Sequence, residues 1–211
     1  MPRNKLTKER IFFAAVDCFS EKGFKQCTMQ EIAEKVDIKA PSIYKHFTNK
    51  KEILIEIFEY FTKNLNTRRM PVEQIVEAID REPIRTVFSK LFFRFDIESG
   101  EYTLLNKIAR IVMDMAHENK DAEKTFRLVM IENPTKYLTD IFTKLIELGK
   151  LKAFDYKSVT FQIIAFSFLA LEMGLLKETN RKEVSENYKK GIEMMARCFE
   201  RADLLVKKSK H

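Results

Sequence analysis

Glycine and proline are scarce in this chain of 211 residues, which contains only five of each. Because these two residue types interrupt regular structure most often, their scarcity favours long, uninterrupted helices. Apolar residues recur at spacings of three and four along almost the whole sequence, and no segment shows a convincing strand-like alternation. The sequence therefore predicts an all-α fold.

Capping residues and the few breakers divide the chain into predicted helices. The first helix begins at the N-cap candidate Thr7 and ends at Lys22-Gly23, where glycine stops it. A short helix after Thr28 ends in a turn at residues 36–39, and Asn133-Pro134 is expected to break or kink the chain. Further helices are predicted over residues 40–47, 50–66, 72–80, 83–98, 102–118, 121–132, 134–148, 155–178 and 181–206.

The helix after Thr28 carries a strong start signal. Thr28 and Glu31 have the T-x-x-E spacing of a capping box, in which each side chain bonds the backbone amide of the other residue. Cys27 and Ile32 occupy the hydrophobic staple positions on either side. We therefore expect a firmly fixed helix start at this point.

The segment IKAPSIYKHFTNKKEIL, residues 38–54, is basic and aromatic. On a helical wheel its apolar side consists of Ala40, Ile43 and Phe47, with Tyr44 at the edge. Its other side consists of Pro41, Ser42, Lys45 and His46. So short a helix is unstable alone, so we expect its apolar side to dock on the first helix and its polar side to be presented. Asn49 and Glu52 then repeat the capping signature and start the next helix.

Three helices of which the last two are joined by a tight turn form the helix-turn-helix plan, whose final helix fits the major groove of DNA. The charge distribution also favours DNA binding by the N-terminal region. Residues 1–51 carry 11 basic and 6 acidic side chains, whereas residues 52–206 are about neutral. The basic tail, residues 207–211, is interpreted as a solubilising end. We expect a helix-turn-helix domain at residues 1–50, a connecting helix at 50–66, and a C-terminal helical-bundle domain for effector binding and dimerisation within 51–211.

Side chains around this short helix suit two kinds of DNA contact. Lys45 can donate to guanine or to phosphate, Ser42 can bond either, and Pro41 can pack on a thymine methyl group. Thr28, Tyr44, His46 and Lys50 are better suited to hold phosphates. Lys39 either caps the short helix through its backbone or reaches DNA, and the sequence leaves both open. The expected DNA-contacting residues are Thr28, Gln30, Lys39, Pro41, Ser42, Tyr44, Lys45, His46 and Lys50.

The N-terminal region resembles the DNA-binding domain of the TetR family of transcriptional regulators over residues 7–54. The resemblance is carried by T-M-Q-E-I-A at 28–33, Y-K-H-F at 44–47 and N-K at 49–50. Many members have Ala-Gly-Val-Ser where this chain has Val-Asp-Ile-Lys at 36–39, so the turn glycine and the serine cap are missing. The resemblance implies an all-helical homodimer that binds a palindromic operator and is released by a small ligand.

The C-terminal part suggests a dimer. The predicted helix 155–178 is apolar nearly all round, and such a helix needs cover on every face, some of which a second subunit can supply. The expected dimer-interface residues are Phe161, Phe168, Leu171, Leu175, Tyr188, Ile192, Met195 and Phe199.

The same part is rich in flexible apolar residues. Eighteen phenylalanines and nine methionines favour a deformable interior, which suggests an apolar or aromatic effector, although each residue taken singly also fits an ordinary core. The candidate ligand-binding residues are Phe88, Phe92, Phe95, Leu104, Ile108, Met113, Phe126, Met130 and Phe161.

Other classes of function find little support. Common catalytic, phosphate-binding and metal-ligand motifs are absent from the sequence, so we expect no enzyme activity, no cofactor and no metal. Cys18, Cys27 and Cys198 are far apart in sequence and are expected as buried thiols in a reducing cytoplasm. No segment is apolar for long enough to span a membrane.

The main hypothesis is a dimeric, ligand-responsive repressor. One alternative is a regulator that needs no ligand, or one that activates transcription. The other is a helical effector-binding or enzymatic module whose N-terminal domain has lost DNA binding. Binding to a palindromic duplex, and its weakening by a compound, would discriminate among them.

Overall fold

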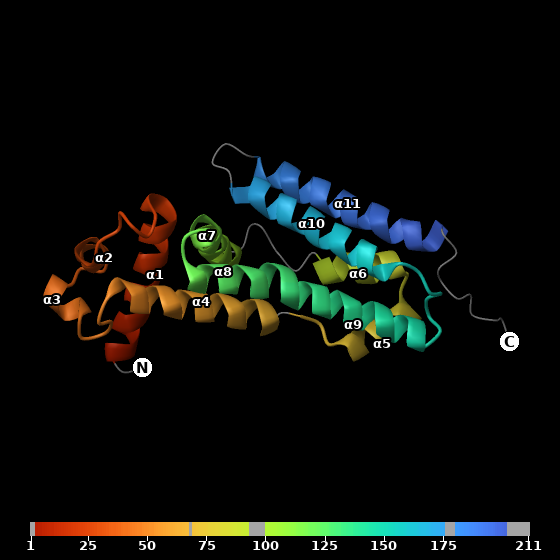
Figure 1. Cartoon of the computed structure of the whole chain (residues 1–211), viewed down its shortest axis with the longest axis horizontal. Helices are drawn as coiled ribbons and strands as arrows, with labels where there is room; N and C mark the ends of the chain where they lie inside the picture. The colour runs from red at the N-terminus through yellow and green to blue at the C-terminus, as the bar shows by residue number, and fades with distance from the viewer. Residues whose placement is uncertain (1–2, 68, 93–99, 176–179, 202–211) are drawn as a thin grey trace. The chain divides into compact units, whose positions relative to one another are not determined.

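The computed structural model describes residues 3–67, 69–92, 100–175 and 180–201 of the chain. The regular elements of these residues are eleven α-helices and one π-helical segment, which confirms the predicted all-α fold (Figure 1). They are α1 (Arg3–Lys22), α2 (Met29–Lys35), α3 (Ala40–Ile43), α4 (Lys50–Thr67), α5 (Val72–Arg81), α6 (Ile84–Phe92), α7 (Gly100–Met115), α8 (Lys120–Phe126), η1 (Arg127–Glu132), α9 (Asn133–Glu147), α10 (Tyr156–Leu175) and α11 (Arg181–Arg201). Among the described residues, no helix combines the length and the apolar character that crossing a bilayer would require.

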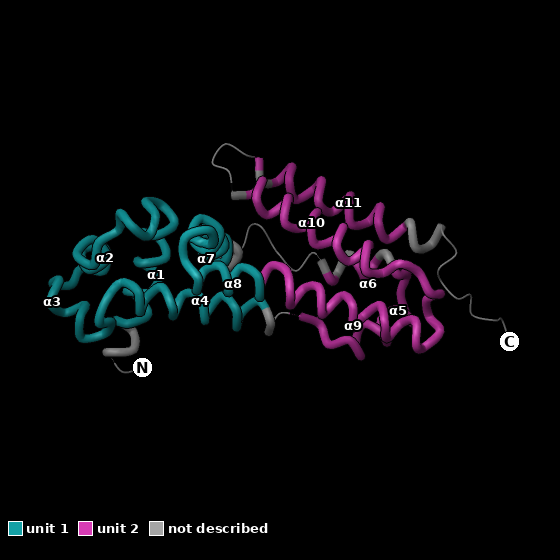
Figure 2. Tube along the Cα trace, viewed as in Figure 1, with its two compact units in different colours: residues 1–65, 99–128 teal, residues 66–98, 129–211 magenta. Residues whose placement is uncertain are grey.

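The chain forms two compact units, each assembled from two stretches of sequence (Figure 2). Unit 1 comprises residues 1–65 and 99–128, and unit 2 comprises residues 66–98 and 129–211. This division differs from the expected boundary at residues 50/51. The reason is that α7 packs on α1 and α8 packs on α7, with Lys107 Nζ of α7 lying 2.6 Å from Asp17 Oδ1 of α1.

The core of unit 1 includes the apolar face of α1. Ile11, Ala15 and Phe19 repeat every four residues along α1 and are buried, as the periodicity predicts. α1 ends where predicted: Gly23 has a φ of +83°, and its N–H donates to the Phe19 carbonyl oxygen at 3.0 Å. A glycine suits this left-handed conformation because it has no Cβ to clash.

The core of unit 2 is centred on Phe142 of α9, which is completely buried. Its ring lies 5.4 Å from that of Phe154, 6.0 Å from that of Phe88 and 6.4 Å from that of Tyr156, measured between centroids. Because these partners come from α6, α10 and the segment before α10, one aromatic side chain fastens three parts of the unit together.

The packing of α10 against α11 depends on a glycine. A Cβ on Gly191 of α11 would lie 2.4 Å from the end of the Phe166 ring of α10, so only glycine permits this approach. The Phe166 ring stacks on that of Tyr188 at 5.4 Å, and the Tyr188 hydroxyl lies 2.9 Å from Ser167 Oγ. The two helices lie side by side in Figure 1.

Of the break or kink expected at Asn133-Pro134, the break is wrong, because the chain stays helical there. The π-helical segment η1 leads directly into α9, with Pro134 in the first turn. A π-helical turn inserts an extra residue, which relieves the clash of a proline ring with the preceding turn. The Asn133 carbonyl oxygen accepts a hydrogen bond from Arg69 Nη1 at 2.7 Å.

Candidate nucleic-acid interface

The capping box at the start of α2 forms as its spacing predicts. The backbone N–H of Glu31 donates to Thr28 Oγ1 at 3.2 Å, and that of Thr28 donates to Glu31 Oε2 at 2.9 Å. The staple residues Cys27 and Ile32 are both fully buried. These contacts fix the start of α2 and leave Thr28 exposed.

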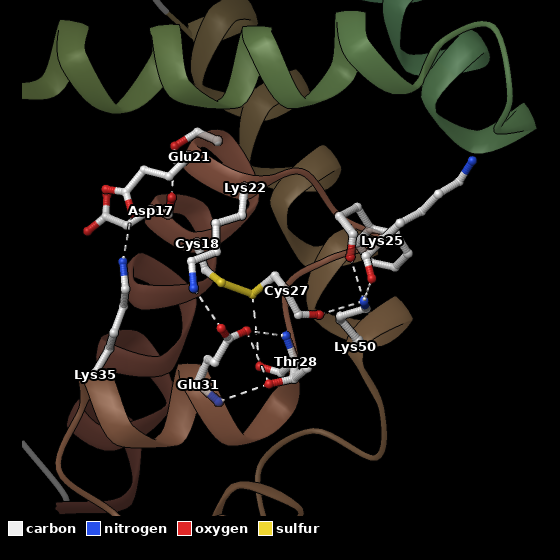
Figure 3. Close-up of a disulfide and its surroundings, with 12 residues drawn as sticks. Asp17, Cys18, Glu21, Lys22, Lys25, Cys27, Thr28, Glu31, Lys35 and Lys50 are labelled. Carbon is white, nitrogen blue, oxygen red and sulfur yellow. Dashed lines mark hydrogen bonds and ion pairs between the residues drawn. A yellow bond between two sulfur atoms is a disulfide. The ribbon is translucent and has the colours of Figure 1, made fainter.

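Glu31 also holds α2 against α1. Its Oε1 lies 2.6 Å from Nζ of Lys22, in the last turn of α1 (Figure 3). The hydrogen bond from Lys22, followed by the backbone N–H of Thr28, lowers the pKa of Glu31 to about 2. The carboxylate is therefore charged at neutral pH and has partners on both helices.

The turn between α2 and α3 is closed by two backbone hydrogen bonds of a Schellman motif. The N–H of Ile38 donates to the Ala33 carbonyl oxygen at 3.1 Å, and the N–H of Asp37 donates to that of Glu34 at 3.1 Å. Asp37 has a φ of 55°, a conformation that usually belongs to glycine. Arg10 Nη2 binds the Val36 carbonyl oxygen at 2.8 Å and ties this turn to α1.

The presented helix is shorter than expected. α3 has four residues, Ala40–Ile43, and the expected helix over 40–47 continues only as turns, in which the N–H of Phe47 donates to the Ile43 carbonyl oxygen at 3.1 Å. Ile43 and Phe47 are buried, as predicted, and Pro41 lies in the first turn. So short a helix suffices because the buried side chains of Ile43 and Phe47 anchor the end of α3 and the turns that follow it.

Lys39 occupies the N-cap of α3 and makes no side-chain cap. Its backbone carbonyl oxygen instead accepts a hydrogen bond from the N–H of Ser42 at 2.7 Å. The cap is thus supplied by the backbone alone, and the Lys39 side chain is exposed.

The side chains expected to face DNA are for the most part accessible. Tyr44 is 54% exposed, Thr28, Gln30, Pro41 and Lys45 are also exposed, and Ser42 and His46 are half-buried. Gln30 Nε2 donates to Glu34 Oε1 at 3.0 Å on α2. α2 and α3 contact each other, so one part of unit 1 carries these residues.

Lys50 is engaged differently from the expected phosphate contact. Its ammonium group donates to the carbonyl oxygen of Cys27 at 2.6 Å and also to that of Phe24, whose ring centroid lies 4.4 Å from Nζ (Figure 3). Burial lowers the pKa of this ammonium. Lys50 therefore fastens the turn between α1 and α2, a role for which the sequence carries no clear signal.

The cysteine expectation needs correction. Cys18 and Cys27 are not separate buried thiols but form a disulfide between α1 and the residue before the N-cap of α2, with Cα atoms 6.0 Å apart (Figure 3). The staple position of Cys27 and the place of Cys18 on the buried face of α1 were the available signals. The side chain of Cys198 lies outside the described residues.

The expected ligand-binding residues are not gathered in one unit. Leu104, Ile108, Met113 and Phe126 belong to unit 1, whereas Phe88, Met130 and Phe161 belong to unit 2. Phe95 and the side chain of Phe92 lie outside the described residues. A hollow of about 280 Å³ in unit 2 has none of these nine residues in its wall, which consists of Met70, Gln74, Glu77, Ala78, Arg81, Glu82 and Val87.

The expected dimer residues differ in their exposure to solvent. Phe161 is 74% exposed, whereas Ile192 is buried at 2% exposure and so belongs to the interior of its own unit. Phe168, Leu171, Tyr188 and Met195 are half-buried, and the side chains of Leu175 and Phe199 lie outside the described residues.

The geometry defines a helix-turn-helix protein, and comparison with known proteins agrees. Residues 11–57 match the family model described as bacterial regulatory proteins of the tetR family. The chain is 46% identical over 96 residues to IcaR, the negative transcriptional regulator of the biofilm operon icaADBC in Staphylococcus aureus (strain Newman), covering 43% of this chain and 47% of IcaR. It is 30% identical over 69 residues to the class G tetracycline repressor protein of Vibrio anguillarum, covering 33% of each.

Two solved structures share the fold over nearly the whole chain. A TetR transcription regulator from Haloarcula marismortui matches with a TM-score of 0.69 and 16% identity, covering 92% of this chain and 98% of that one. A TetR-family regulator from Cytophaga hutchinsonii matches with a TM-score of 0.65 and 16% identity, covering 99% of both. The matched segments span less than half the length of the curated relatives. Residues 11–57 are therefore similar in sequence to the tetR family of bacterial regulatory proteins, and the chain shares the fold of TetR regulators.

Proposed function

We propose that this protein is a homodimeric repressor that binds a palindromic operator through α2, α3 and the turn after α3. The observation that carries the proposal is the presentation of α3: Ile43 and Phe47 are buried beneath it, while Tyr44 and Lys45 are exposed. A short helix anchored from below suits entry into the major groove. Access to DNA places the protein in the cytoplasm.

The proposed contacts fall into two kinds. Lys45, Ser42 and Pro41 lie on or just after α3 and are assigned to base edges, with Lys45 donating to guanine. Thr28, Gln30, Lys39, Tyr44 and His46 are assigned to the phosphates on either side. Lys50 is given a supporting role instead, because its ammonium group is held by the carbonyl oxygens of the turn before α2.

Repression and ligand release are proposed from the relatives. IcaR is named a negative regulator, and the Vibrio anguillarum protein is named a tetracycline repressor. A related fold from Saccharomonospora viridis, with a TM-score of 0.68, was solved in complex with choline. We infer that this chain is a repressor released by a small ligand, for which the phenylalanine- and methionine-rich body favours an apolar or aromatic compound.

The proposed dimer interface is an apolar stripe on α10. Phe161, Ala165, Leu169 and Met173 follow one another at intervals of four residues, which places them on one side of the helix. All four are exposed, with Phe161 at 74%, Leu169 at 56% and Met173 at 44%. Exposed apolar stripes of this kind commonly mark protein interfaces. Phe161→Glu is expected to yield monomers by analytical ultracentrifugation, whereas Ile131→Glu, at an exposed apolar residue of η1, is expected to leave the dimer intact.

Operator binding is the decisive test. Selection from a library of random duplexes should enrich an inverted repeat, and its affinity should fall steeply as salt is raised, because each neutralised phosphate releases counterions. Enrichment of no duplex would contradict the proposal. Weakening of the selected complex by an apolar or aromatic compound would support ligand release, and insensitivity to a broad set of such compounds would favour the ligand-independent alternative.

A further inference from the structure

We propose that Cys18 and Cys27 form a redox-active dithiol site, oxidised by hydroperoxides and reduced by low-molecular-weight thiols, whose state tunes operator affinity. The site is a covalent link between α1 and the start of α2, the first helix of the helix-turn-helix (Figure 3). The regulatory part of this inference rests on the proposed DNA-binding function. The chemistry of the site does not.

The disulfide is adjacent in sequence to a residue proposed to contact phosphate. Cys27 immediately precedes Thr28, the N-cap of α2, and the Cys27 carbonyl oxygen accepts the hydrogen bond from Lys50. Cys18 lies on the buried face of α1, nine residues earlier in the chain. The bond therefore closes a small loop that contains the end of α1, the Gly23 turn and the approach to α2.

The two sulfurs lie beside an ion pair. Both sulfur atoms and a Glu31 carboxylate oxygen lie within 4.8 Å of one another, and the Lys22 ammonium group lies 2.6 Å from that carboxylate. The thiolate is the form of a cysteine that reacts with oxidants and disulfides, and Lys22 offsets the negative charge that Glu31 places near it. The site thus holds two sulfurs within bonding reach of each other.

The same three groups are a poorer metal site. A metal ion would need two thiolates and the Glu31 carboxylate, but Oε1 of that group is paired with Lys22 and Oε2 accepts from the N–H of Thr28. Binding a metal would therefore break the capping box that fixes α2. The arrangement fits a sulfur–sulfur bond, which leaves the carboxylate and its partners undisturbed.

The redox step balances with a hydroperoxide as two-electron oxidant. One thiolate attacks a peroxide oxygen, the O–O bond breaks, and that cysteine becomes a sulfenic acid. The leaving alkoxide, or hydroxide from hydrogen peroxide, takes up a proton from solvent and departs as an alcohol or water. The second thiolate attacks the sulfenic sulfur, forms the disulfide and expels hydroxide, which leaves as water. In the reverse direction two small thiols each lose one electron and one proton, forming their own disulfide and restoring both cysteines.

The state of the bond should change the geometry at the start of α2. Two free thiols cannot approach as closely as two bonded sulfurs, so reduction separates α1 from the residue before Thr28. The disulfide also removes freedom that DNA binding would otherwise have to restrain. The oxidised protein should therefore bind the operator more tightly, by about threefold or more, than the reduced protein.

The test uses the 211-residue chain with Cys198→Ser, so that the third thiol does not contribute. Thiol titration and intact mass after hydrogen peroxide should give no free thiol and a loss of two hydrogens, and reduction with a small dithiol should restore two thiols. Operator affinity of the two states is then measured by fluorescence anisotropy, with the Cys18→Ala, Cys27→Ala double variant as the control that cannot switch. The oxidised form should bind at least about three times more tightly, and the control should not respond.

Each other outcome bears on a separate part of the inference. Two free thiols after peroxide, or one tightly bound zinc ion per chain by metal analysis, would overturn the site. Equal affinity of the two states would overturn its regulatory role. If neither state bound any selected duplex, both the proposed DNA-binding function and the regulatory role would be contradicted. The thiol titration would still test the redox chemistry of the two cysteines.

The rate at which a small thiol reduces the disulfide is a second measurement. It tells whether the loop held by Lys50 must open before the thiol can reach the sulfurs. Both cysteines are fully buried, and Lys50 holds the carbonyl oxygens of Phe24 and Cys27 in the loop that the disulfide closes. Lys50→Met should therefore speed reduction of the disulfide several-fold, because the loop opens more often. Lys51→Met, one residue along α4, should leave the reduction rate unchanged, and equal acceleration in both variants would contradict this arrangement.

Discussion

The N–H of Ile38 donates to the carbonyl oxygen of Ala33 at 3.1 Å and closes the turn between α2 and α3. The resemblance to the TetR family led us to expect a glycine before Ile38, and here that residue is Asp37, with a φ of 55°. The turn geometry therefore survives without the glycine, since aspartate tolerates the left-handed region better than most residues do. Having aspartate instead of glycine raises the conformational free energy of the turn but does not change its backbone geometry.

Asp37→Gly is expected to raise the free energy of unfolding by up to about 1 kcal/mol, because relief of the strained φ outweighs the extra freedom of the unfolded chain. It should also strengthen DNA binding, since it removes a negative charge beside α3. Asp37→Asn is the matched control: it removes the charge but retains the side chain. Chemical denaturation and anisotropy measure the two effects, and a loss of stability in Asp37→Gly would contradict the strain argument.

Lys39→Ser should supply the side-chain cap that α3 lacks. The gain is expected at about 0.5–1 kcal/mol of unfolding free energy, typical of a serine N-cap. DNA affinity should nevertheless fall, because a cation near the phosphates is lost. Lys39→Ala loses the same charge without gaining a cap, so equal stability of the two variants would show that the backbone cap already suffices.

Lys45→Ala is expected to relax base preference at one position of each half-site, with a cost of about 1–3 kcal/mol on the preferred sequence. Tyr44→Phe should instead weaken all duplexes alike, because it removes only a hydroxyl that bonds phosphate. Repeating the duplex selection with each variant measures the difference. An unchanged preference in Lys45→Ala would place this side chain on phosphate and leave base reading to Ser42 or Pro41.

Gly191→Ala should destabilise unit 2 or displace the Phe166 ring, since the new Cβ would lie 2.4 Å from that ring. Gly174→Ala is the matched control, because a Cβ there would meet no atom within 4 Å. The control should gain about 0.5–1 kcal/mol from the lower conformational freedom of alanine. Thermal unfolding of both variants measures the effect, and an equal gain in both would mean that the Phe166 ring moves aside freely.

Acid should weaken unit 1 through Glu31. Its pKa falls from 4.5 to about 2 in the folded state, so the folded protein favours the charged form and gains stability from it above pH 4.5. That contribution declines as the pH falls from 4.5 towards 2, where the folded carboxylate takes up its proton. Glu31→Gln should flatten the pH dependence of unfolding in this window, and Glu34→Gln, elsewhere on α2, should change it much less.

Local signals predicted the helix-turn-helix well. The capping box at Thr28, the glycine stop at Gly23 and the buried pair Ile43 and Phe47 all appear as their spacing indicated. Each depends on residues within a few positions of one another, whose backbone and side-chain preferences are encoded locally. The resemblance to the TetR family rests on the same short-range pattern.

Contacts between distant residues were beyond local prediction. Lys107 pairs with Asp17 across ninety residues, and this pairing helps to draw α7 into unit 1, against the expected boundary at residues 50/51. The π-helical segment before Pro134 overrides a break that the proline by itself suggests. The proposed ligand pocket was likewise inferred from composition, which carries no information on which side chains meet.

The sequence by itself determined the helical class, the capped start of α2 and the identity of the presented residues, because periodicity and capping act over one or two helical turns. Only the tertiary structure decided the partners of Lys50 and Cys18. Lys50 turns towards the carbonyl oxygens of Phe24 and Cys27, and Cys18 meets Cys27, because the fold brings the ends of α1, α2 and α4 together. The sequence specifies the chemical groups of each side chain, whereas the tertiary packing determines which other groups they contact.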